Sequence, residues 1–347
     1  MSSETQRYLA VMPRHREAAS SAEITRLDPA AAVYDHLGVA VLNLDEDGLA
    51  QAKGSGHFER IEPDREVKTV DLVVPWNIIK VGARRARRVT DGTGVRVAVL
   101  DTGLDRTHPD LRANIAGGYN FVANNAFFDD DNGHGTHVAG VIAANGSYHL
   151  VGCAPGCTLY GLKVLDYRGY GYYSWVIAAL DWCVRNHVHV ANLSLGGTAY
   201  SRAFRKACVY AYYQGVLQVA AAGNQGCRRR GSSILYPARF WPCIAVGAIA
   251  RNGVRPRWSS CGQQLELCAP GVNIYSTYYG NSYVTLSGTS QACPHVTGIA
   301  ALIKARLPGY TMHRIRLMMR SAARYPTSNR SRRYYGYGMV RLPTRLL

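Results

Sequence analysis

The chain has 347 residues, of which 47% are hydrophobic and 18% charged. This balance excludes an intrinsically disordered chain, and the length allows one large catalytic domain or two smaller ones. No segment approaches the ~18 consecutive uncharged apolar residues that a membrane-spanning helix requires, so we expect no membrane span. Residues 1–21 also lack the apolar core of a secretory signal peptide.

The charge is unevenly distributed along the chain. The formal net charge is +17, yet residues 1–74 hold 8 basic and 13 acidic residues, whereas residues 75–347 hold 32 basic and 10 acidic ones. Segments of opposite charge attract one another over roughly a Debye length. The basic excess indicates a solvated surface, a preference for acidic substrates or anionic surfaces, or nucleic-acid binding. The sequence shows no recognised nucleic-acid-binding module, so we do not expect a nucleic-acid partner.

Nine cysteines are many for a cytosolic protein. The sequence contains no CxxC pair, which disfavours a zinc or redox site. The odd number leaves at least one thiol free. Disulfides are compatible with export, and the sequence leaves their pairing open.

The first 70 residues predict a small α+β unit. Segments typical of strands occupy residues 7–12, 39–44 and 57–61, and segments of helical character occupy residues 30–37 and 49–53. Residues 45–48, with the sequence Asp-Glu-Asp-Gly, indicate a turn.

After about residue 71 the pattern changes to continuous apolar runs, which suit strands buried on both faces. These runs are residues 95–100, 158–164, 188–193, 216–221 and 243–246, and helical segments occupy residues 137–144, 174–186, 200–214 and 291–306. Their alternation predicts an α/β fold with a doubly wound, mostly parallel sheet flanked by helices. We therefore expect two domains, residues 1–70 and 71–347.

Three polar motifs stand where predicted strands end or helices begin. Asp101 opens an Asp-Thr-Gly motif after the first buried strand, His134 lies in the sequence Asn-Gly-His-Gly-Thr-His, and Ser290 ends the sequence Ser-Gly-Thr-Ser. Nucleophilic acyl transfer needs a hydroxyl, a base that takes its proton, and a carboxylate that holds the base. The three residues supply one of each.

Two further groups are candidate donors to an oxyanion. Ser290 begins a predicted helix, so its N–H belongs to a helix N-terminus, which is a good donor to a negative charge. Asn224 ends the sequence Ala-Ala-Gly-Asn after another buried strand, and its side-chain amide is a second donor.

In the order Asp, His, Asn, Ser, these motifs resemble the subtilisin-like serine peptidases, or subtilases. Further similar segments are residues 74–78, 105–111, 171–175, 194–197 and 335–338. The resemblance implies a catalytic domain over residues 71–347 that hydrolyses peptide bonds in polypeptide substrates. It also implies Ser290 as nucleophile, His134 as general base and then acid, Asp101 as orienting carboxylate, and Asn224 as oxyanion donor.

Residues 1–70 resemble the inhibitor-like prodomain of that family, through residues 38–42 and 58–64. The resemblance implies a zymogen whose own prodomain assists folding, inhibits the enzyme intramolecularly and is removed by autocatalytic cleavage. The opposite charges of the two parts are compatible with this docking. We expect cleavage at the Val70–Asp71 bond and a monomeric enzyme.

The resemblance also implies where a substrate binds. Its backbone would pair with residues 169–171 and 194–196, and the primary pocket would lie between residues 194–196 and 221–223. The implied substrate-binding residues are Gly169, Gly171, Tyr173, Ser194, Leu195, Gly196, Ala222, Gly223 and Leu235. Leu235 would shorten the primary pocket and favour apolar side chains of medium size, unless it points into the core.

Calcium is implied by the resemblance as a structural cofactor. Asp110 matches a carboxylate ligand of the family's strong site, and the loop that contains Asn145, Tyr148 and Leu150 would supply further oxygen ligands. The acidic residues 129–131 are a candidate for a second, weaker ion, or else a solvated turn.

Two other functions remain as alternatives. A catalytically silent relative would act as a binding module, although the intact Asp101, His134, Asn224 and Ser290 argue against it. A polyanion binder would use the basic surface and would lose affinity steeply with salt. For the location of the protein, the prodomain type and the cysteines favour secretion, whereas the missing signal peptide favours an intracellular protein.

Overall fold

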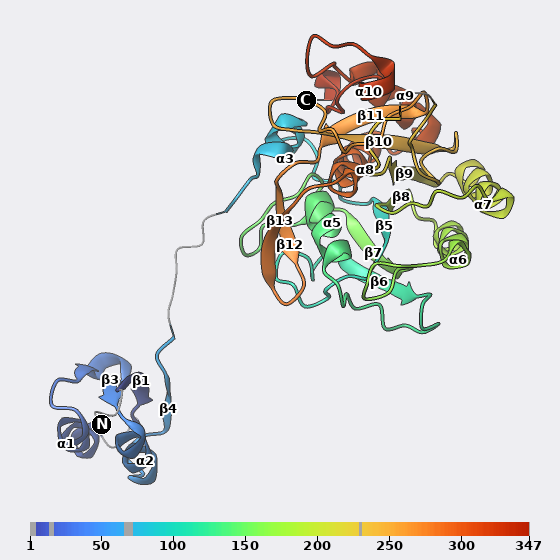
Figure 1. Ribbon diagram of the computed structural model, residues 1–347. Coiled ribbons are helices and arrows are strands. Elements are labelled where there is room, and N and C mark those ends of the chain that lie inside the picture. Colours follow the sequence, from blue (N-terminus) through green and yellow to red (C-terminus); the bar gives the residue numbers. More distant parts are fainter. Residues whose placement is uncertain (1–4, 14–16, 66–71, 229–230, 347) are drawn as a thin grey trace. The chain divides into compact units, whose positions relative to one another are not determined.

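The computed structural model describes residues 5–13, 17–65, 72–228 and 231–346. The chain divides into two compact units, Met1–Thr69 and Val70–Leu347 (Figure 1). Each unit has a hydrophobic core of its own. The predicted cleavage bond Val70–Asp71 lies outside the described residues.

The N-terminal unit is a four-stranded antiparallel sheet with two helices. The sheet order is β2-β3-β1-β4, with β1 (Gln6–Val11), β2 (Ala32–Tyr34), β3 (Val39–Leu44) and β4 (Arg60–Pro63), and the helices are α1 (Glu17–Leu27) and α2 (Glu46–Gly54). Alternate residues of β3 are buried, and Ala40 and Leu42 pack in the core with Ala10 and Ile24. This is the α+β unit that the sequence predicts.

Three local features of this unit differ from the prediction. Residues 30–37 are not helical: they form the edge strand β2, in which Ala32 pairs with Val41, and a 3-10 turn over Asp35–Leu37. Residues 45–48 start a helix instead of a turn, because Asp45 caps α2 by accepting the Gly48 N–H at 2.8 Å. Helix α1 was not predicted.

The larger unit contains a seven-stranded sheet whose neighbouring strands are all parallel. The sheet order is β11-β10-β9-β8-β5-β7-β6, with β5 (Arg96–Asp101), β6 (Ile115–Asn120), β7 (Thr158–Lys163), β8 (Val190–Leu193), β9 (Leu217–Ala221), β10 (Cys243–Ile249) and β11 (Leu265–Pro270). The predicted α/β class is confirmed. The strands β6 and β11 were not predicted, and β6 is an edge strand that contains two glycines, Gly117 and Gly118.

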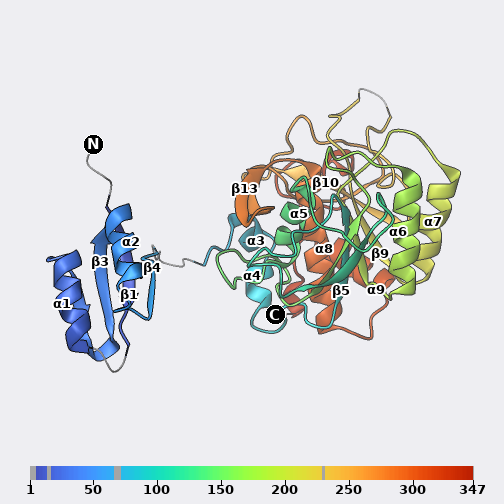
Figure 2. The same ribbon diagram turned by 90° about the horizontal axis from the view of Figure 1, so that it is seen from below.

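Helices cover both faces of this sheet (Figure 2). One face carries α5 (His134–Ala143), α8 (Thr289–Arg306) and α9 (Met312–Ala322), and the other carries α6 (Tyr173–Arg185) and α7 (Arg202–Tyr213). Strand β5 shows the alternation, because Val97 and Val99 pack into the first core and Ala98 and Leu100 into the second. The sheet is therefore doubly wound, as predicted.

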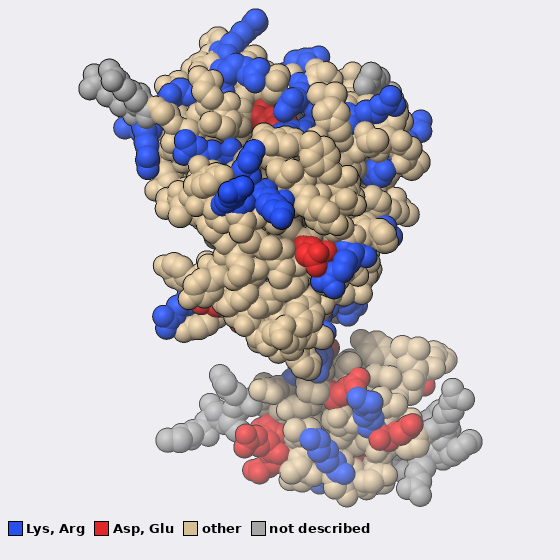
Figure 3. Space-filling model, turned by 90° about the vertical axis from the view of Figure 1, so that its right-hand side faces the viewer, with Lys and Arg blue, Asp and Glu red and all other residues tan. Residues whose placement is uncertain are grey.

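Smaller elements complete this unit. They are α3 (Trp76–Lys80), α4 (Ala83–Ala86), α10 (Arg332–Tyr335), the 3-10 turn Thr344–Leu346, and a hairpin of β12 (Ile274–Tyr278) and β13 (Ser282–Leu286). In the part of the chain that the structure describes, no helix is both long and apolar enough to cross a bilayer. On the face of the larger unit seen in Figure 3, basic side chains clearly outnumber acidic ones.

Candidate active site

Polar residues gather at the carboxyl ends of three adjacent strands. Asp101 ends β5, Ser194 follows β8, and Asn224 follows β9 by three residues. Because β5, β8 and β9 are neighbours in a parallel sheet, these ends share one edge. Helix α5 begins at His134, and Ser290 is the second residue of α8.

Asp101 and His134 are in direct contact. His134 Nδ1 lies 2.7 Å from Asp101 Oδ1, which also accepts the Thr102 N–H at 2.8 Å. The Asp101 side chain is fully buried, whereas 26% of the His134 side chain is exposed. A carboxylate only accepts, so Nδ1 carries the proton and Nε2 is left as a base. Burial lowers the pKa of His134, but the charge and hydrogen bond of Asp101 and the charge of Asp130 outweigh burial and raise it above 6.5.

Asp130 connects the segments that carry Asp101 and His134. Its Oδ1 accepts the Thr102 hydroxyl at 2.8 Å and the Gly133 N–H at 2.9 Å, and its Oδ2 accepts the Thr136 N–H at 2.9 Å. One buried carboxylate therefore joins the residue after Asp101 to the first turn of α5. The sequence analysis missed this role, because the Asp-Asp-Asp run suggested an ion site.

Ser290 is hydrogen-bonded to Ser194, the residue that follows β8 at this edge of the sheet. Its hydroxyl donates to the Ser194 carbonyl at 3.0 Å, and the Ser194 hydroxyl donates to the Ser290 carbonyl at 2.9 Å. Asn192, which the sequence did not single out, donates to the Ser194 hydroxyl at 2.9 Å and accepts the Thr297 hydroxyl at 2.8 Å. Proton transfer to His134 requires the Ser290 hydroxyl to turn toward Nε2, and such contacts commonly tighten when substrate binds.

Asn224 is oriented by the start of α8. Its Oδ1 accepts both the N–H and the hydroxyl of Thr289 at 3.0 Å, which fixes the side-chain amide and leaves Nδ2 as the donor end of that amide. A Cβ atom built on Gly288 would lie 3.4 Å from Asn224 Nδ2 and 3.7 Å from the Ser290 nitrogen. The two donors thus border one small space, as stabilisation of an oxyanion requires.

A cleft of about 440 Å³ extends from His134 along two segments of backbone. Its lining includes Thr102, Asn132, Leu165, residues 168–173, Val176 and residues 194–197. Gly171 has no room for a side chain, because a Cβ there would lie 2.1 Å from the Val164 carbonyl oxygen. The Tyr173 hydroxyl donates to the Ala199 carbonyl at 2.9 Å and ties the two walls together. The predicted substrate-binding residues Gly169, Gly171, Tyr173, Ser194, Leu195 and Gly196 all line this cleft.

Leu235 lies between the two walls of the predicted primary pocket. A Cβ on Gly223 would lie 2.6 Å from Leu235 Cγ, and a Cβ on Gly196 would lie 2.8 Å from Leu235 Cβ. The Leu235 N–H donates to the Ala222 carbonyl at 3.0 Å. Its side chain is therefore placed against both glycines, where it limits the space between them.

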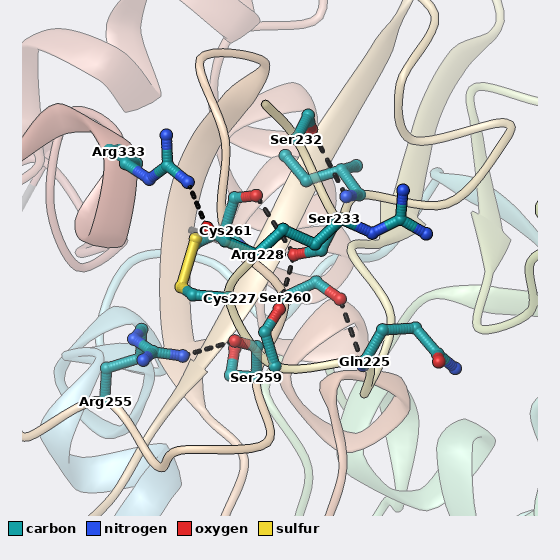
Figure 4. The surroundings of a disulfide bond; sticks show 12 residues. Gln225, Cys227, Arg228, Ser232, Ser233, Arg255, Ser259, Ser260, Cys261 and Arg333 are labelled. Atoms are coloured by element: carbon teal, nitrogen blue, oxygen red, sulfur yellow. Dashed lines mark hydrogen bonds between the residues drawn. A yellow bond between two sulfur atoms is a disulfide. The ribbon is translucent and has the colours of Figure 1, made fainter. Parts of the chain in front are cut away.

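A disulfide between Cys227 and Cys261 closes the loop that follows Asn224 (Figure 4). Next to it, the Gln225 N–H donates to the Ser260 hydroxyl at 3.2 Å. The other seven cysteines are free thiols, all buried. The structure thus supplies a pairing that the sequence left open, and this disulfide anchors the loop that follows Asn224.

Two other histidines of the motifs have structural partners. His137 Nε2 lies 3.0 Å from the Ile274 carbonyl, and His295 Nδ1 lies 2.9 Å from the Gln291 carbonyl. Burial lowers the pKa of His137 to about 3 and that of His295 to about 4. Both are neutral near pH 7 and support the fold.

The surroundings of Asp110 do not fit the predicted calcium site. Its carboxylate is fully buried and accepts the N–H groups of Tyr148, His149 and Leu150, at 2.7 to 3.2 Å, and the Tyr283 hydroxyl at 2.6 Å. These four donors occupy the lone pairs that a cation would need. The loop presents N–H groups to Asp110, whereas calcium binds oxygen atoms.

Asn145, another predicted ligand of that site, is engaged elsewhere. Asn145 donates to Asn114 Oδ1 at 2.9 Å and accepts the Ser147 N–H at 2.9 Å. A Cβ on Gly146 would lie 2.7 Å from Leu72 Cδ1, so hydrocarbon covers this part of the loop. Among the described residues, no group of three or more His, Cys, Asp or Glu side chains is arranged to hold a metal ion.

The second candidate ion site, residues 129–131, is likewise occupied by protein donors. Asp129 pairs with Arg106 at 2.5 Å, and Asp131 pairs with Lys163 at 2.7 Å. Asp130 is the buried connector already described. Each carboxylate of the run has its own partner, so the expected weak ion is not supported.

Comparisons with known proteins agree with this geometry. The chain matches the Subtilase family over residues 92–338. It is 42% identical over 341 residues to a thermostable alkaline protease of Halalkalibacterium halodurans, covering 98% of this chain and 91% of that protein. It is 39% identical over 311 residues to subtilisin E of Bacillus subtilis, covering 88% of this chain and 80% of that protein.

A solved structure of a cold-adapted subtilisin-like serine proteinase is also similar, with a TM-score of 0.65 and 36% identity, covering 73% of this chain and 89% of that one. The family match, these relatives and the parallel sheet lead to one conclusion: the chain belongs to the subtilase family and is a subtilisin-like serine endopeptidase.

Proposed function

We propose that the chain is a self-processing zymogen in which Asp101, His134 and Ser290 form the catalytic triad and Asn224 completes the oxyanion hole. The observation that carries the proposal is the 2.7 Å contact of His134 Nδ1 with a fully buried Asp101, which leaves Nε2 as the base. One chain supplies every group, so we propose that the enzyme acts as a monomer.

The proposed reaction proceeds in two steps. His134 Nε2 takes the hydroxyl proton of Ser290 as Oγ attacks the peptide carbonyl, and the Ser290 N–H and Asn224 Nδ2 donate to the oxyanion. His134 then protonates the leaving amine, which gives an acyl-enzyme. Water, activated by the same base, hydrolyses the acyl-enzyme and restores Ser290.

The N-terminal unit is the proposed intramolecular inhibitor and folding assistant. It has a separate core, and the similarity to the alkaline protease of Halalkalibacterium halodurans covers 98% of this chain, so it includes this unit. Residues 1–74 carry 13 acidic and 8 basic residues, opposite in sign to the rest of the chain. This complementarity favours docking at low ionic strength.

The test compares intact masses of the wild-type chain and the Ser290→Ala variant after expression. We expect the wild-type chain to lose residues 1–70 and the variant to stay full length. Added wild-type enzyme should then cut the variant in trans, which shows that its cleavage bond is accessible. Shortening of the variant when it is expressed alone would contradict self-processing.

The pH dependence of hydrolysis is expected to follow His134. The neutral imidazole is the base, so kcat/KM should fall as pH drops through the pKa of His134. Because the net effect of burial, Asp101 and Asp130 raises this pKa, the midpoint should lie above 6.5. A pH–rate profile on a peptide substrate measures it, and a midpoint below 6.5 would contradict the assigned pairing.

Replacing Leu235 by glycine is expected to enlarge the primary pocket. We compare peptides with phenylalanine or alanine immediately before the cleaved bond. The ratio of their kcat/KM values, phenylalanine over alanine, should rise about tenfold or more, because each methylene group that a hydrophobic pocket can accommodate changes the transition-state free energy by ~1–3 kcal/mol. Peptides that differ only at this position measure the ratio. Leu235→Met, which keeps the volume, should leave the ratio close to that of the wild type, and an equal change in both variants would argue against the pocket assignment.

A further inference from the structure

A second cavity lies in the larger unit, formed by residues near its beginning and its end. It has a volume of about 790 Å³. One side is made by residues 79–88, which include α4, and the other by the end of α9, Arg324 and residues 341–344. None of its lining residues lines the cleft beside His134. This cavity therefore has no part in the proposed reaction.

Five arginines line this cavity, and its lining contains no Asp or Glu. They are Arg84, Arg85, Arg88, Arg324 and Arg341, all exposed to solvent. We call this cavity the arginine groove. Its inner surface includes the buried apolar residues Val81, Leu342 and Pro343. The lining thus combines exposed arginine side chains with these three buried apolar residues, which we call the apolar floor.

No carboxylate of the described residues neutralises the positive charge of the arginine groove. Over the described ranges, none of its five arginines forms an ion pair with a carboxylate, and only Arg324 has side-chain hydrogen bonds, to the Ser321 and Ala323 carbonyls. Other arginines of this unit are paired: Arg316 lies 2.5 Å from Glu266, and Arg106 lies 2.5 Å from Asp129.

Arg87, on the same segment, adds to the local excess of positive charge. Its Nε and Nη2 are buried and have no hydrogen-bond acceptor among the described residues. Burial and the neighbouring charge of Arg84 lower its pKa. Four arginines therefore stand within residues 84–88, where like charges repel and no acidic residue of the lining relieves them.

We propose that the arginine groove binds an anion that carries several phosphate groups in a row. Planar guanidinium groups bind phosphate oxygens in pairs, and phosphate carries about −1.5 to −2 charges at pH 7. One phosphate would leave most of the five positive charges unneutralised, whereas three linked phosphates match them. Inorganic oligophosphate and the triphosphate of a nucleotide share this chemistry.

Binding of this anion would connect two segments near the ends of the larger unit. Residues 79–88 follow its first described residues, and residues 341–344 precede its last ones. A multivalent anion that contacts both segments favours the folded state, because the unfolded chain does not hold the five arginines together. The expected effect is on stability, with kcat/KM on a small peptide unchanged.

The test titrates tripolyphosphate against the full-length Ser290→Ala chain, which does not digest itself under the proposed mechanism, at an ionic strength held constant with NaCl. We expect the midpoint of thermal unfolding to rise by about 5 °C at a hundredfold excess over Kd. Orthophosphate at the same ionic strength should have a much smaller effect. ATP distinguishes an inorganic oligophosphate from a nucleotide as the ligand. If ATP binds with the affinity of tripolyphosphate, the phosphates alone are recognised; if ATP binds more tightly, its base also contacts the apolar floor.

Two variants with equal loss of charge locate the site. Arg84→Gln/Arg85→Gln/Arg341→Gln removes three groove arginines, and Arg202→Gln/Arg205→Gln/Lys206→Gln removes three exposed cations of α7, outside the groove. We expect the first to weaken tripolyphosphate binding at least tenfold and the second to leave it unchanged. In the Ser290 background, an unchanged peptidase rate shows that the groove variant is folded. The proposal would be overturned if both variants lost tripolyphosphate affinity equally. It would also be overturned if tripolyphosphate did not raise the thermal midpoint of the chain whose groove is unsubstituted.

Discussion

Alanine at His134 or at Ser290 is expected to lower kcat by about 10⁶-fold, and the two changes together are expected to lower it no further. This size and this non-additivity are those known from a subtilisin, a relative of this chain. The reason is that the hydroxyl and its base act as one unit, so that removal of either leaves the other without a role. What remains is the contribution of the oxyanion donors and of substrate binding.

The comparison needs chains of equal length. The variants are cut by a trace of wild-type enzyme, which is then inactivated with a fluorophosphonate and removed, and intact mass verifies the product. His313→Ala is the matched control, since His313 is exposed and contacts Tyr212 at 2.7 Å, away from the catalytic residues. Losses that add up in the double variant would mean that His134 and Ser290 act independently, contrary to the proposed triad.

Alanine at Asp110 is expected to destabilise the larger unit by about 3–5 kcal/mol, since it leaves several buried donors without an acceptor. The orphaned groups are the N–H groups of residues 148–150 and the Tyr283 hydroxyl. Thermal unfolding should shift down by about 10 °C. Asp129→Ala removes an exposed partner of Arg106 and is the control, with an expected loss below ~1 kcal/mol.

Calcium distinguishes two explanations of the Asp110 effect. If donors of the protein hold the carboxylate, the loss caused by Asp110→Ala is the same in excess calcium and in excess chelator. If Asp110 binds calcium, the wild-type chain gains stability from the ion and the variant does not. A calcium response that disappears with Asp110 would therefore refute the hydrogen-bonded arrangement.

The pH dependence of this contribution has a definite sign. Burial raises the pKa of Asp110, but the Tyr283 hydroxyl and the three N–H donors outweigh burial and lower it below 3.8. A group with a lowered pKa stabilises the fold fully above its unfolded pKa. The contribution of Asp110 is thus present at neutral pH and is lost only as pH falls through the lowered value.

The sequence singles out the proposed catalytic groups, whereas it does not single out the groups that hold them in place. Asp101, His134 and Ser290 stand in short contiguous motifs whose residue types suit one chemistry, so no tertiary information is needed to name them. Asn192 and Asp130 act through contacts with residues that folding brings near them. The local sequence of Asn192 is equally consistent with an amide that only fills the core, and that of Asp130 with a solvated turn. Their roles depend on which donors the fold directs at them.

The calcium prediction stays a prediction, and the arrangement around Asp110 disfavours it for a related physical reason. Asp110 and the loop around Leu150 do come together, as the resemblance implies, but the loop directs N–H groups instead of carbonyl oxygens at the carboxylate. The path of the loop backbone decides whether its N–H groups or its carbonyl oxygens face Asp110. The number of residues between Asp110 and the loop does not determine that path. In the N-terminal unit, the pairing of Ala32 with Val41 in β3 likewise overrides the helical character of residues 30–37.

The seven buried thiols give the folded chain a distinctive behaviour toward alkylating reagents. Burial raises the pKa of Cys157 to about 12 and also raises those of Cys183, Cys268 and Cys293, so neither access nor thiolate is available in the native state. Opening of the core exposes them. The rate at which iodoacetamide modifies each cysteine therefore reports the opening of the element that carries it, as Cys293 does for α8 and Cys268 for β11, and no cysteine has to be introduced.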